Sequence, residues 1–205
     1  LNFSNPNDHV PEAERNNQVI KERVRATYHR LPYVQLTRNM VKYLTLESAK
    51  KLNFVPAKYG VSKYYSPRMI VTKQNLNYAK HCKFAFGTYV QANHEPKPSN
   101  TNAPRALDCI YLRYTTNHQG GHELLHLQTN QTIIRQIVTP VPVTSSVIRQ
   151  VHSIAEREKM PEGLKIENFY GNILYDSAWI AGVDFVDEEI EDIEDEDYED
   201  DEYEE

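Results

Sequence analysis

The last 30 residues of the chain constrain its fold more than any other stretch, because they are too acidic to pack. Residues 176–205 hold 17 of the 29 Asp and Glu side chains and no Lys or Arg, and 15 of those acids fall within the 19 residues 187–205. Carboxylates at this density repel one another and bury little apolar surface. We therefore expect residues 162–205 to form a disordered acidic tail, and ordered structure to lie upstream.

The rest of the chain is basic. Residues 1–175 carry 23 Lys and Arg against 12 Asp and Glu, a net charge of +11, which favours partners rich in phosphate. The two cysteines, Cys82 and Cys109, are too few for a disulfide framework, so we expect a reducing compartment and no secretion. No apolar run approaches the roughly 20 residues that span a bilayer. The start has neither a signal peptide nor an initiator Met, so we expect no membrane partner and a chain cut from a longer protein.

Two amphipathic helices are predicted within residues 1–60. Apolar residues recur at helical spacing from residue 12 to residue 31 and again from residue 36 to residue 52, with Pro32 between the two segments. Two helices alone cannot enclose a core. The pattern therefore predicts a helical hairpin from an incomplete domain, whose apolar faces would cover a sheet or helices absent from the sequence. Residues 61–83 are predicted to be a connector with a short helical turn.

Residues 84–143 change to a β-rich pattern. Proline and glycine separate four segments that are rich in strand-forming residues, at 84–92, 107–114, 122–128 and 132–138. Four or five short antiparallel strands predict a small barrel or sandwich. Residues 144–161 are predicted to hold a last helix, Val147–Met160, capped by Ser145 and ended by Pro161. The expected fold class is α+β.

The clearest candidate site lies on the first helix. Glu14, Gln18, Lys21 and Arg25 fall on one face of a helix, because their spacing follows its 3.6-residue repeat. These residues form a stripe along the helix that begins with a carboxylate and continues with polar and basic side chains. Taken without its surroundings, Glu14 would be an ordinary solvated carboxylate at a helix start, where the helix dipole favours acids.

The residues around this stripe resemble a known family. Pro-Glu-Ala-Glu-Arg-Asn-Asn-Gln at 11–18 resembles the helix that carries the third carboxylate of DDE-type integrases, in the form found in copia-type retrotransposon Pol polyproteins. Tyr-Ser-Pro-Arg at 65–68 resembles the Ser-Pro segment behind that core, and Phe-Ala-Phe-Gly-Thr-Tyr-Val at 84–90 resembles the strand that opens the following barrel. The resemblance covers residues 9–143. It implies the C-terminal helices of an RNase H-like integrase core followed by an SH3-like barrel.

The resemblance also implies a role for each residue of the stripe. Glu14 would be the catalytic, metal-binding carboxylate, with Glu12 as an alternative on the same turn, and Gln18, Lys21 and Arg25 would face DNA. Integrases of this kind use three carboxylates to hold two Mg²⁺ or Mn²⁺ ions, and only the third is matched in this sequence. We therefore expect the chain alone to hold no cofactor and to be catalytically incomplete. Its partners would be DNA and the remaining Pol segments, an upstream integrase core and a downstream reverse transcriptase, in the nucleus or in a cytoplasmic virus-like particle.

A second candidate surface lies in the connector. Lys58, Lys63 and Arg68 belong to a stretch, residues 58–83, in which basic and aromatic residues are interleaved. This composition is typical of surfaces that bind nucleic acid. A solvated basic surface would have the same composition, and no motif spacing decides between the two interpretations.

A short motif in the β-rich region suggests zinc chemistry at first sight. His-Glu-Leu-Leu-His at 122–126 has the H-E-x-x-H pattern of zinc metalloproteases, which needs a helix to bring both histidines to one ion. The Gly-Gly pair before it and Thr-Asn at 129–130 leave too short a segment for a helix. On a strand the imidazoles would stand about 13 Å apart at roughly 3.3 Å per residue. We expect His122 and His126 to share a partly exposed face of a strand and to bind no zinc.

A different class of function stays open on the sequence alone. A stand-alone interaction protein could use the acidic tail to mimic nucleic acid and engage basic proteins. The absence of an initiator Met and the incomplete helical core favour the polyprotein fragment.

Overall fold

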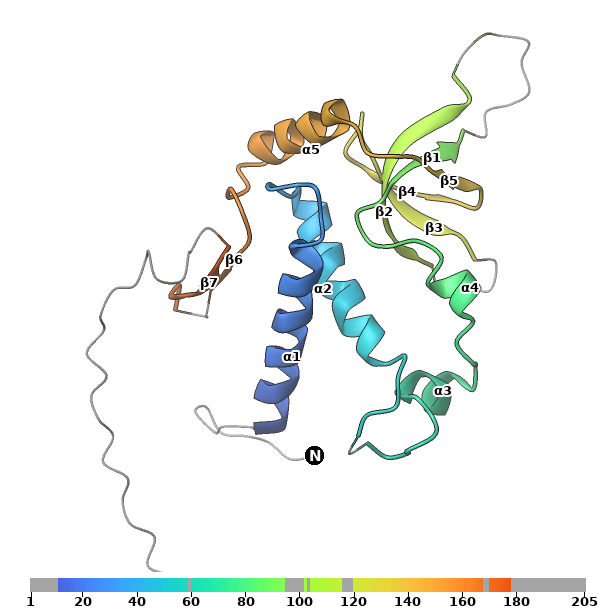
Figure 1. Cartoon of the computed structure of the whole chain (residues 1–205), viewed down its shortest axis with the longest axis vertical. Coiled ribbons are helices and arrows are strands. Elements are labelled where there is room, and N and C mark those ends of the chain that lie inside the picture. The colour runs from blue at the N-terminus through green and yellow to red at the C-terminus, as the bar shows by residue number, and fades with distance from the viewer. Residues whose placement is uncertain are drawn as a thin grey trace, which may run out of the picture.

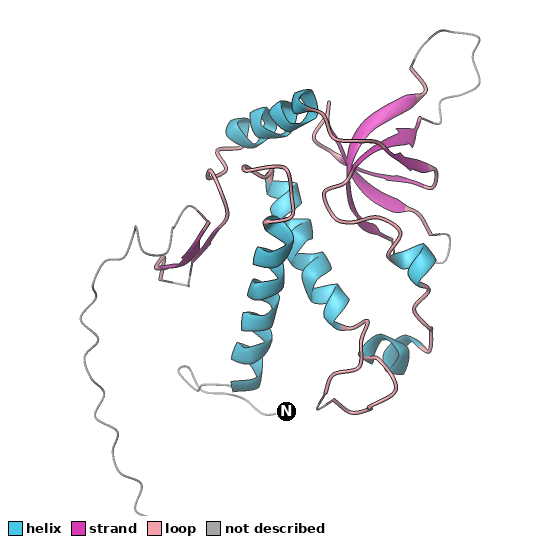
Figure 2. Cartoon of the chain, viewed as in Figure 1, coloured by secondary structure: helices cyan, strands magenta, loops and turns pink. Residues whose placement is uncertain are grey.

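The computed structural model describes residues 11–58, 60–94, 102, 104–115, 120–167 and 170–177, with Pro11 and Glu12 described as backbone only. Over these ranges the chain is mixed α and β, with a five-stranded antiparallel sheet, a two-stranded sheet and several helices (Figures 1 and 2). The predicted α+β class is confirmed at this level. Among the helices of these ranges, none combines the length and the apolar character that crossing a membrane requires.

Two long helices open the described chain, as the sequence predicts. They are α1 (Pro11–Tyr28) and α2 (Arg38–Leu52). The second begins two residues later than expected because Thr37 caps it: the Thr37 Oγ1 accepts a hydrogen bond of 3.3 Å from the Met40 amide. Such a bond satisfies one of the amides that a helix start leaves without a partner.

The connector contains two short helices, whereas the sequence predicts one helical turn. These are α3 (Pro67–Thr72) and α4 (Tyr78–His81). Each begins at a side-chain cap, since Ser66 accepts from the Met69 amide over 3.3 Å and Asn77 accepts from the Lys80 amide over 3.1 Å. The connector is therefore locally ordered without a core of its own.

The five-stranded sheet contains β1 (Tyr89–Asn93), β2 (Ala106–Tyr114), β3 (His122–His126), β4 (Thr132–Arg135) and β5 (Val138–Pro140). The strands lie in the order β4-β3-β2-β1-β5, and every neighbouring pair is antiparallel. The single strand predicted over 132–138 is in fact two, because the chain leaves β3 after Arg135 and crosses to β1, where Val138 pairs with Ala92.

The helices and the sheet share one core, which differs from the separate modules that the sequence suggests. One apolar cluster joins both long helices, the inner face of the sheet and the last helix, with members Val24, Tyr28, Met40, Leu44, Ile110, Leu112, Leu125, Leu127, Val147, Val151 and Ile154. A smaller cluster covers the opposite face of the sheet, with Val90, Cys109, Tyr111, Leu124 and Val138. The helices therefore pack on the sheet of this chain, a contact that the sequence does not predict.

The last helix, α5 (Ser145–Arg157), forms where the sequence predicts one, but it begins two residues and ends three residues before the predicted Val147–Met160. Thr144, not Ser145, occupies the cap, and its Oγ1 accepts from the Val147 amide over 3.5 Å. α5 lies beside the loop that joins α1 to α2 (Figure 1), where the His152 Nε2 accepts a hydrogen bond of 3.2 Å from the Val34 amide.

The structure differs from the expectation of disorder beyond residue 161. Two further strands, β6 (Lys165–Glu167) and β7 (Ile173–Asp176), form an antiparallel hairpin. The physical reason is that apolar residues precede the acidic run: Leu164 is buried in the common core, and Tyr175 packs against it. Lys165 and Asp176 also form an ion pair of 3.1 Å across the hairpin. The prediction for residues 178–205 lies outside the described residues.

Candidate nucleic-acid interface

The stripe predicted on the first helix is present as one surface. Glu14, Gln18, Lys21 and Arg25 line the same cavity of about 240 Å³, together with Asn17 and with residues of the β6–β7 hairpin, Ile166, Leu174 and Tyr175. Glu14, Asn17 and Gln18 are exposed, whereas Lys21 and Arg25 are half-buried. The sequence therefore predicts the shared face correctly, but not the hairpin that borders it.

The hairpin contacts the basic end of the stripe through Tyr175. The Arg25 guanidinium carbon lies 5.1 Å from the centre of the Tyr175 ring, a cation–π geometry. The Tyr175 hydroxyl lies 2.6 Å from His29 Nε2. Burial raises the pKa of Tyr175 despite the opposing charge of Arg25, so the hydroxyl keeps its proton near neutral pH. Arg25 therefore has a structural contact in addition to any role toward DNA.

The residues of the stripe alone cannot bind a pair of divalent ions. Glu14 is the one carboxylate among the residues that line the cavity, and Lys21 and Arg25 bring positive charge. No group of three His, Cys, Asp or Glu side chains that could hold a metal ion occurs in the part of the chain that the structure describes. The side chain of Glu12, the alternative to Glu14, lies outside the described residues.

The three basic residues singled out in the connector differ in their surroundings. Lys58 and Lys63 are exposed, but Arg68 is half-buried. The Arg68 guanidinium carbon lies 5.7 Å from the centre of the Phe54 ring, and the Arg68 amide donates to the Asn53 carbonyl over 3.1 Å. Arg68 therefore joins the connector to the end of α2.

Exposed tyrosines accompany these lysines. Tyr64 is 86% exposed, Tyr78 66% and Tyr65 53%. Aromatic rings in solvent beside lysines are the combination on which nucleic-acid bases stack. In Figure 1 the start of α1 and the connector around α3 both lie at the lower end of the molecule, and the stripe runs from there along α1 to Arg25 in its last turn.

The H-E-x-x-H segment is a strand, β3, as expected, so its histidines lack the helical geometry of a zinc protease. The expectation of partial exposure is wrong, because His122 is 7% exposed and His126 9%. The rings of Phe84, Tyr111 and Tyr114 cover His122. Burial lowers the pKa of both histidines.

The polar members of this segment have local partners. His126 Nδ1 lies 2.8 Å from Thr129 Oγ1. Glu123 accepts a hydrogen bond of 2.7 Å from Arg113 Nε on the neighbouring strand. These contacts give the segment a structural role in the sheet.

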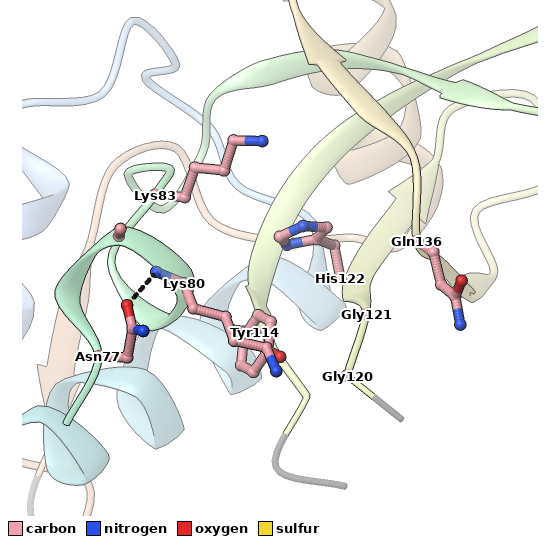
Figure 3. A pocket seen from close by; sticks show the side chains of 9 residues that line it. Asn77, Lys80, Lys83, Tyr114, Gly120, Gly121, His122 and Gln136 are labelled. Atoms are coloured by element: carbon pink, nitrogen blue, oxygen red, sulfur yellow. Dashed lines mark hydrogen bonds between the residues drawn. The ribbon is translucent and has the colours of Figure 1, made fainter. Parts of the chain in front are cut away.

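A second cavity, of about 410 Å³, lies where α4 meets the sheet (Figure 3). The sequence contains two signals for it, the lysines at 80 and 83 and the glycine pair at 120–121. Sequence periodicity cannot show that these segments meet, because they are 40 residues apart and come together only through the fold of the connector against β2 and β3.

Comparison of the chain with models of protein families, with curated proteins and with solved structures found no match. The function of this chain is therefore inferred from its own residues and from the family that they resemble.

Proposed function

We propose that this chain is part of a copia-type retrotransposon Pol polyprotein and that it binds DNA as the C-terminal portion of the integrase. The observation that carries the proposal is the stripe of α1, in which Glu14, Gln18, Lys21 and Arg25 line one cavity along the helix. This is the arrangement that the resemblance to the third-carboxylate helix implies. Lys58 and Lys63, which are exposed, add positive charge for the phosphate backbone.

The strand order supports the same proposal. An SH3-like barrel places its last strand beside its first and continues as a meander through the remaining strands, which is the order β5-β1-β2-β3-β4. The five-stranded sheet has this order, and two apolar clusters cover its opposite faces. The pair α1 and α2 would be the last helices of the RNase H-like core, with Arg68 and the Ser66 cap in the segment that links core and barrel.

The proposed role of this chain in catalysis is partial. Glu14 is the carboxylate that this sequence would supply to the Mg²⁺ or Mn²⁺ ions of the intact integrase, with upstream Pol segments supplying the others. On this proposal the chain by itself joins no DNA ends. Its partners are DNA and the other Pol segments, in the nucleus or in a virus-like particle.

DNA binding by the purified chain tests the proposal. We expect it to bind a fluorescent DNA duplex at low salt, and the double variant Lys21→Gln/Lys63→Gln to bind roughly tenfold more weakly, because two phosphate contacts are lost. The matched control is Arg149→Gln/Lys159→Gln, which removes the same charge from exposed positions on and after α5. We call it the α5 control variant. Equal affinities of the two double variants would contradict a specific role for the stripe and the connector.

A further inference from the structure

The cavity between α4 and the sheet is built from three separate parts of the chain. Asn77, Ala79 and Lys80 come from α4 and its cap, Lys83 follows α4, and the remaining lining residues are Tyr114, Gly120, Gly121, His122 and Gln136 from the strands and their loops. In Figure 3, Lys83 lies above His122 in the view, whereas the side chain of Lys80 runs past Tyr114 toward Gly120.

The charge of this cavity is entirely positive. Lys80 and Lys83 are exposed at its rim, and no Asp or Glu is among its lining residues. Lys83 Nζ also lies 5.1 Å from the centre of the Phe84 ring, and both lysines would attract a negative charge in the cavity. The expected ligand is therefore an anion.

His122 supplies a hydrogen-bonding group at the inner wall. Its side chain is buried, and its Nδ1 is enclosed without a hydrogen-bond partner. A neutral imidazole has one N–H donor and one acceptor nitrogen, and both nitrogens become donors when the ring is protonated. Because His122 lines the cavity, its ring can donate a hydrogen bond to an anion there.

Gly120 leaves space in the wall of the cavity next to Lys80. A Cβ atom at this position would lie 2.5 Å from the Tyr114 hydroxyl and 3.6 Å from Lys80 Cε, and the φ angle of Gly120 is +74°. A larger residue would therefore be strained and would fill the space between the lysine and the sheet. The cavity depends on a glycine at this position.

We propose that this cavity binds a phosphate group of a nucleic-acid strand through Lys80, Lys83 and the ring of His122. Three donors that approach from different sides suit a tetrahedral phosphate, and about 410 Å³ leaves room for the attached sugar. The nucleic-acid source of the phosphate rests on the proposed function, whereas the phosphate chemistry rests on the cavity alone. The site would extend the interface from the connector to the sheet.

Titration of the His122 ring with inorganic phosphate tests the chemistry, because a bound anion favours the protonated imidazole and raises its pKa. The charged and titratable groups that face this ring are Lys80, Lys83, Tyr111, Tyr114 and, across the strand pair, Arg135. By NMR, we expect phosphate to move the His122 ring signals and to raise its pKa. His126, which is also buried on β3 but does not line the cavity, is the internal control. Equal effects on His122 and His126 would overturn the proposal.

Lysine variants then test the source of the phosphate. Lys80→Gln/Lys83→Gln should abolish the phosphate effect on His122 and weaken binding of a DNA duplex roughly tenfold, while the α5 control variant retains both. If phosphate moves His122 but this pair of substitutions leaves DNA affinity unchanged, a nucleic-acid ligand is excluded. If the unmodified chain binds no DNA, the proposed function fails, and the phosphate titration still decides whether the cavity is an anion site.

Discussion

Gly87 is a single residue at which the helical pair meets the sheet. Its φ angle is +80°, and a Cβ atom there would lie 2.4 Å from Leu31 Cδ2, beyond the end of α1. Its amide donates to the Tyr111 carbonyl over 2.9 Å, and its carbonyl accepts from the Tyr33 hydroxyl over 3.2 Å. The backbone at Gly87 is therefore fixed from both sides.

We predict that Gly87→Ala lowers the free energy of unfolding by about 2–5 kcal/mol. Positive φ costs a residue with a Cβ about 1–2 kcal/mol, and displacement of Leu31 adds a packing cost of about 1–3 kcal/mol. Gly171→Ala is the matched control, since Gly171 has a φ angle of +84° but no atom within 4 Å of its Cβ position. Urea denaturation should show a larger loss of the free energy of unfolding for Gly87→Ala than for Gly171→Ala. Equal losses in both variants would show that contact with Leu31 contributes nothing.

At the scale of single residues, the sequence predicts which residues form the stripe of α1. It does not predict which residues line the cavity between α4 and the sheet. Residues on one helix face are related by spacing alone, so the periodicity of the sequence is enough to place Glu14 and Lys21 together. The burial of His122, in contrast, cannot be predicted in this way, because strand alternation gives a face but not the side chains that cover it. The rings that bury His122 belong to Phe84, Tyr111 and Tyr114, and one of these precedes the sheet.

At the scale of elements, α2 tests whether the helices and the sheet form one core. Leu44 is 1% exposed within the cluster that also contains sheet residues, whereas Leu46 on the same helix is 42% exposed. We predict that Leu44→Ala lowers the free energy of unfolding by about 2–5 kcal/mol, and that Leu46→Ala changes it by less than about 0.5 kcal/mol.

Amide hydrogen exchange would show which helices and strands lose stability in the Leu44→Ala variant. With one shared core, Leu44→Ala should speed exchange in β2 and β3 as well as in α2, because these elements then unfold together. Faster exchange confined to α1 and α2 would instead support the separate helical module that the sequence suggests.

The elements themselves are largely predictable, but their partners are not. Periodicity predicts both long helices, the strand character of β3 and the last helix. It cannot divide residues 132–138 into β4 and β5, because the change of neighbour from β3 to β1 leaves no mark on local alternation. The β6–β7 hairpin escapes prediction for a related reason: Leu164, directly before β6, and Tyr175 in β7 act through contacts with distant elements.

At the scale of the whole molecule, the acidic side chains are concentrated at one end of a chain that is otherwise basic. Residues 178–205 hold 16 acidic side chains, and the rest of the chain, with 23 Lys and Arg against 13 Asp and Glu, has a net charge of +10. The described part ends at Ser177, directly after β7, whose Tyr175 lines the same cavity as Lys21 and Arg25. The acidic segment is thus attached next to the basic stripe.

We predict that deletion of residues 178–205, which leaves the β6–β7 hairpin intact, tightens binding of a DNA duplex. The acids compete with DNA phosphates for the same lysines and arginines, so the shortened chain should also lose affinity more steeply with salt, by about 0.9 log unit per log of salt for each additional phosphate neutralised. A chain of full length with Asn and Gln in place of these acids is the control that keeps length and removes charge, and it should behave like the shortened chain. Fluorescence anisotropy at about 50 mM salt, where screening is weak, is the measurement. Equal affinities of all three chains would mean that the acidic segment does not compete for the basic region.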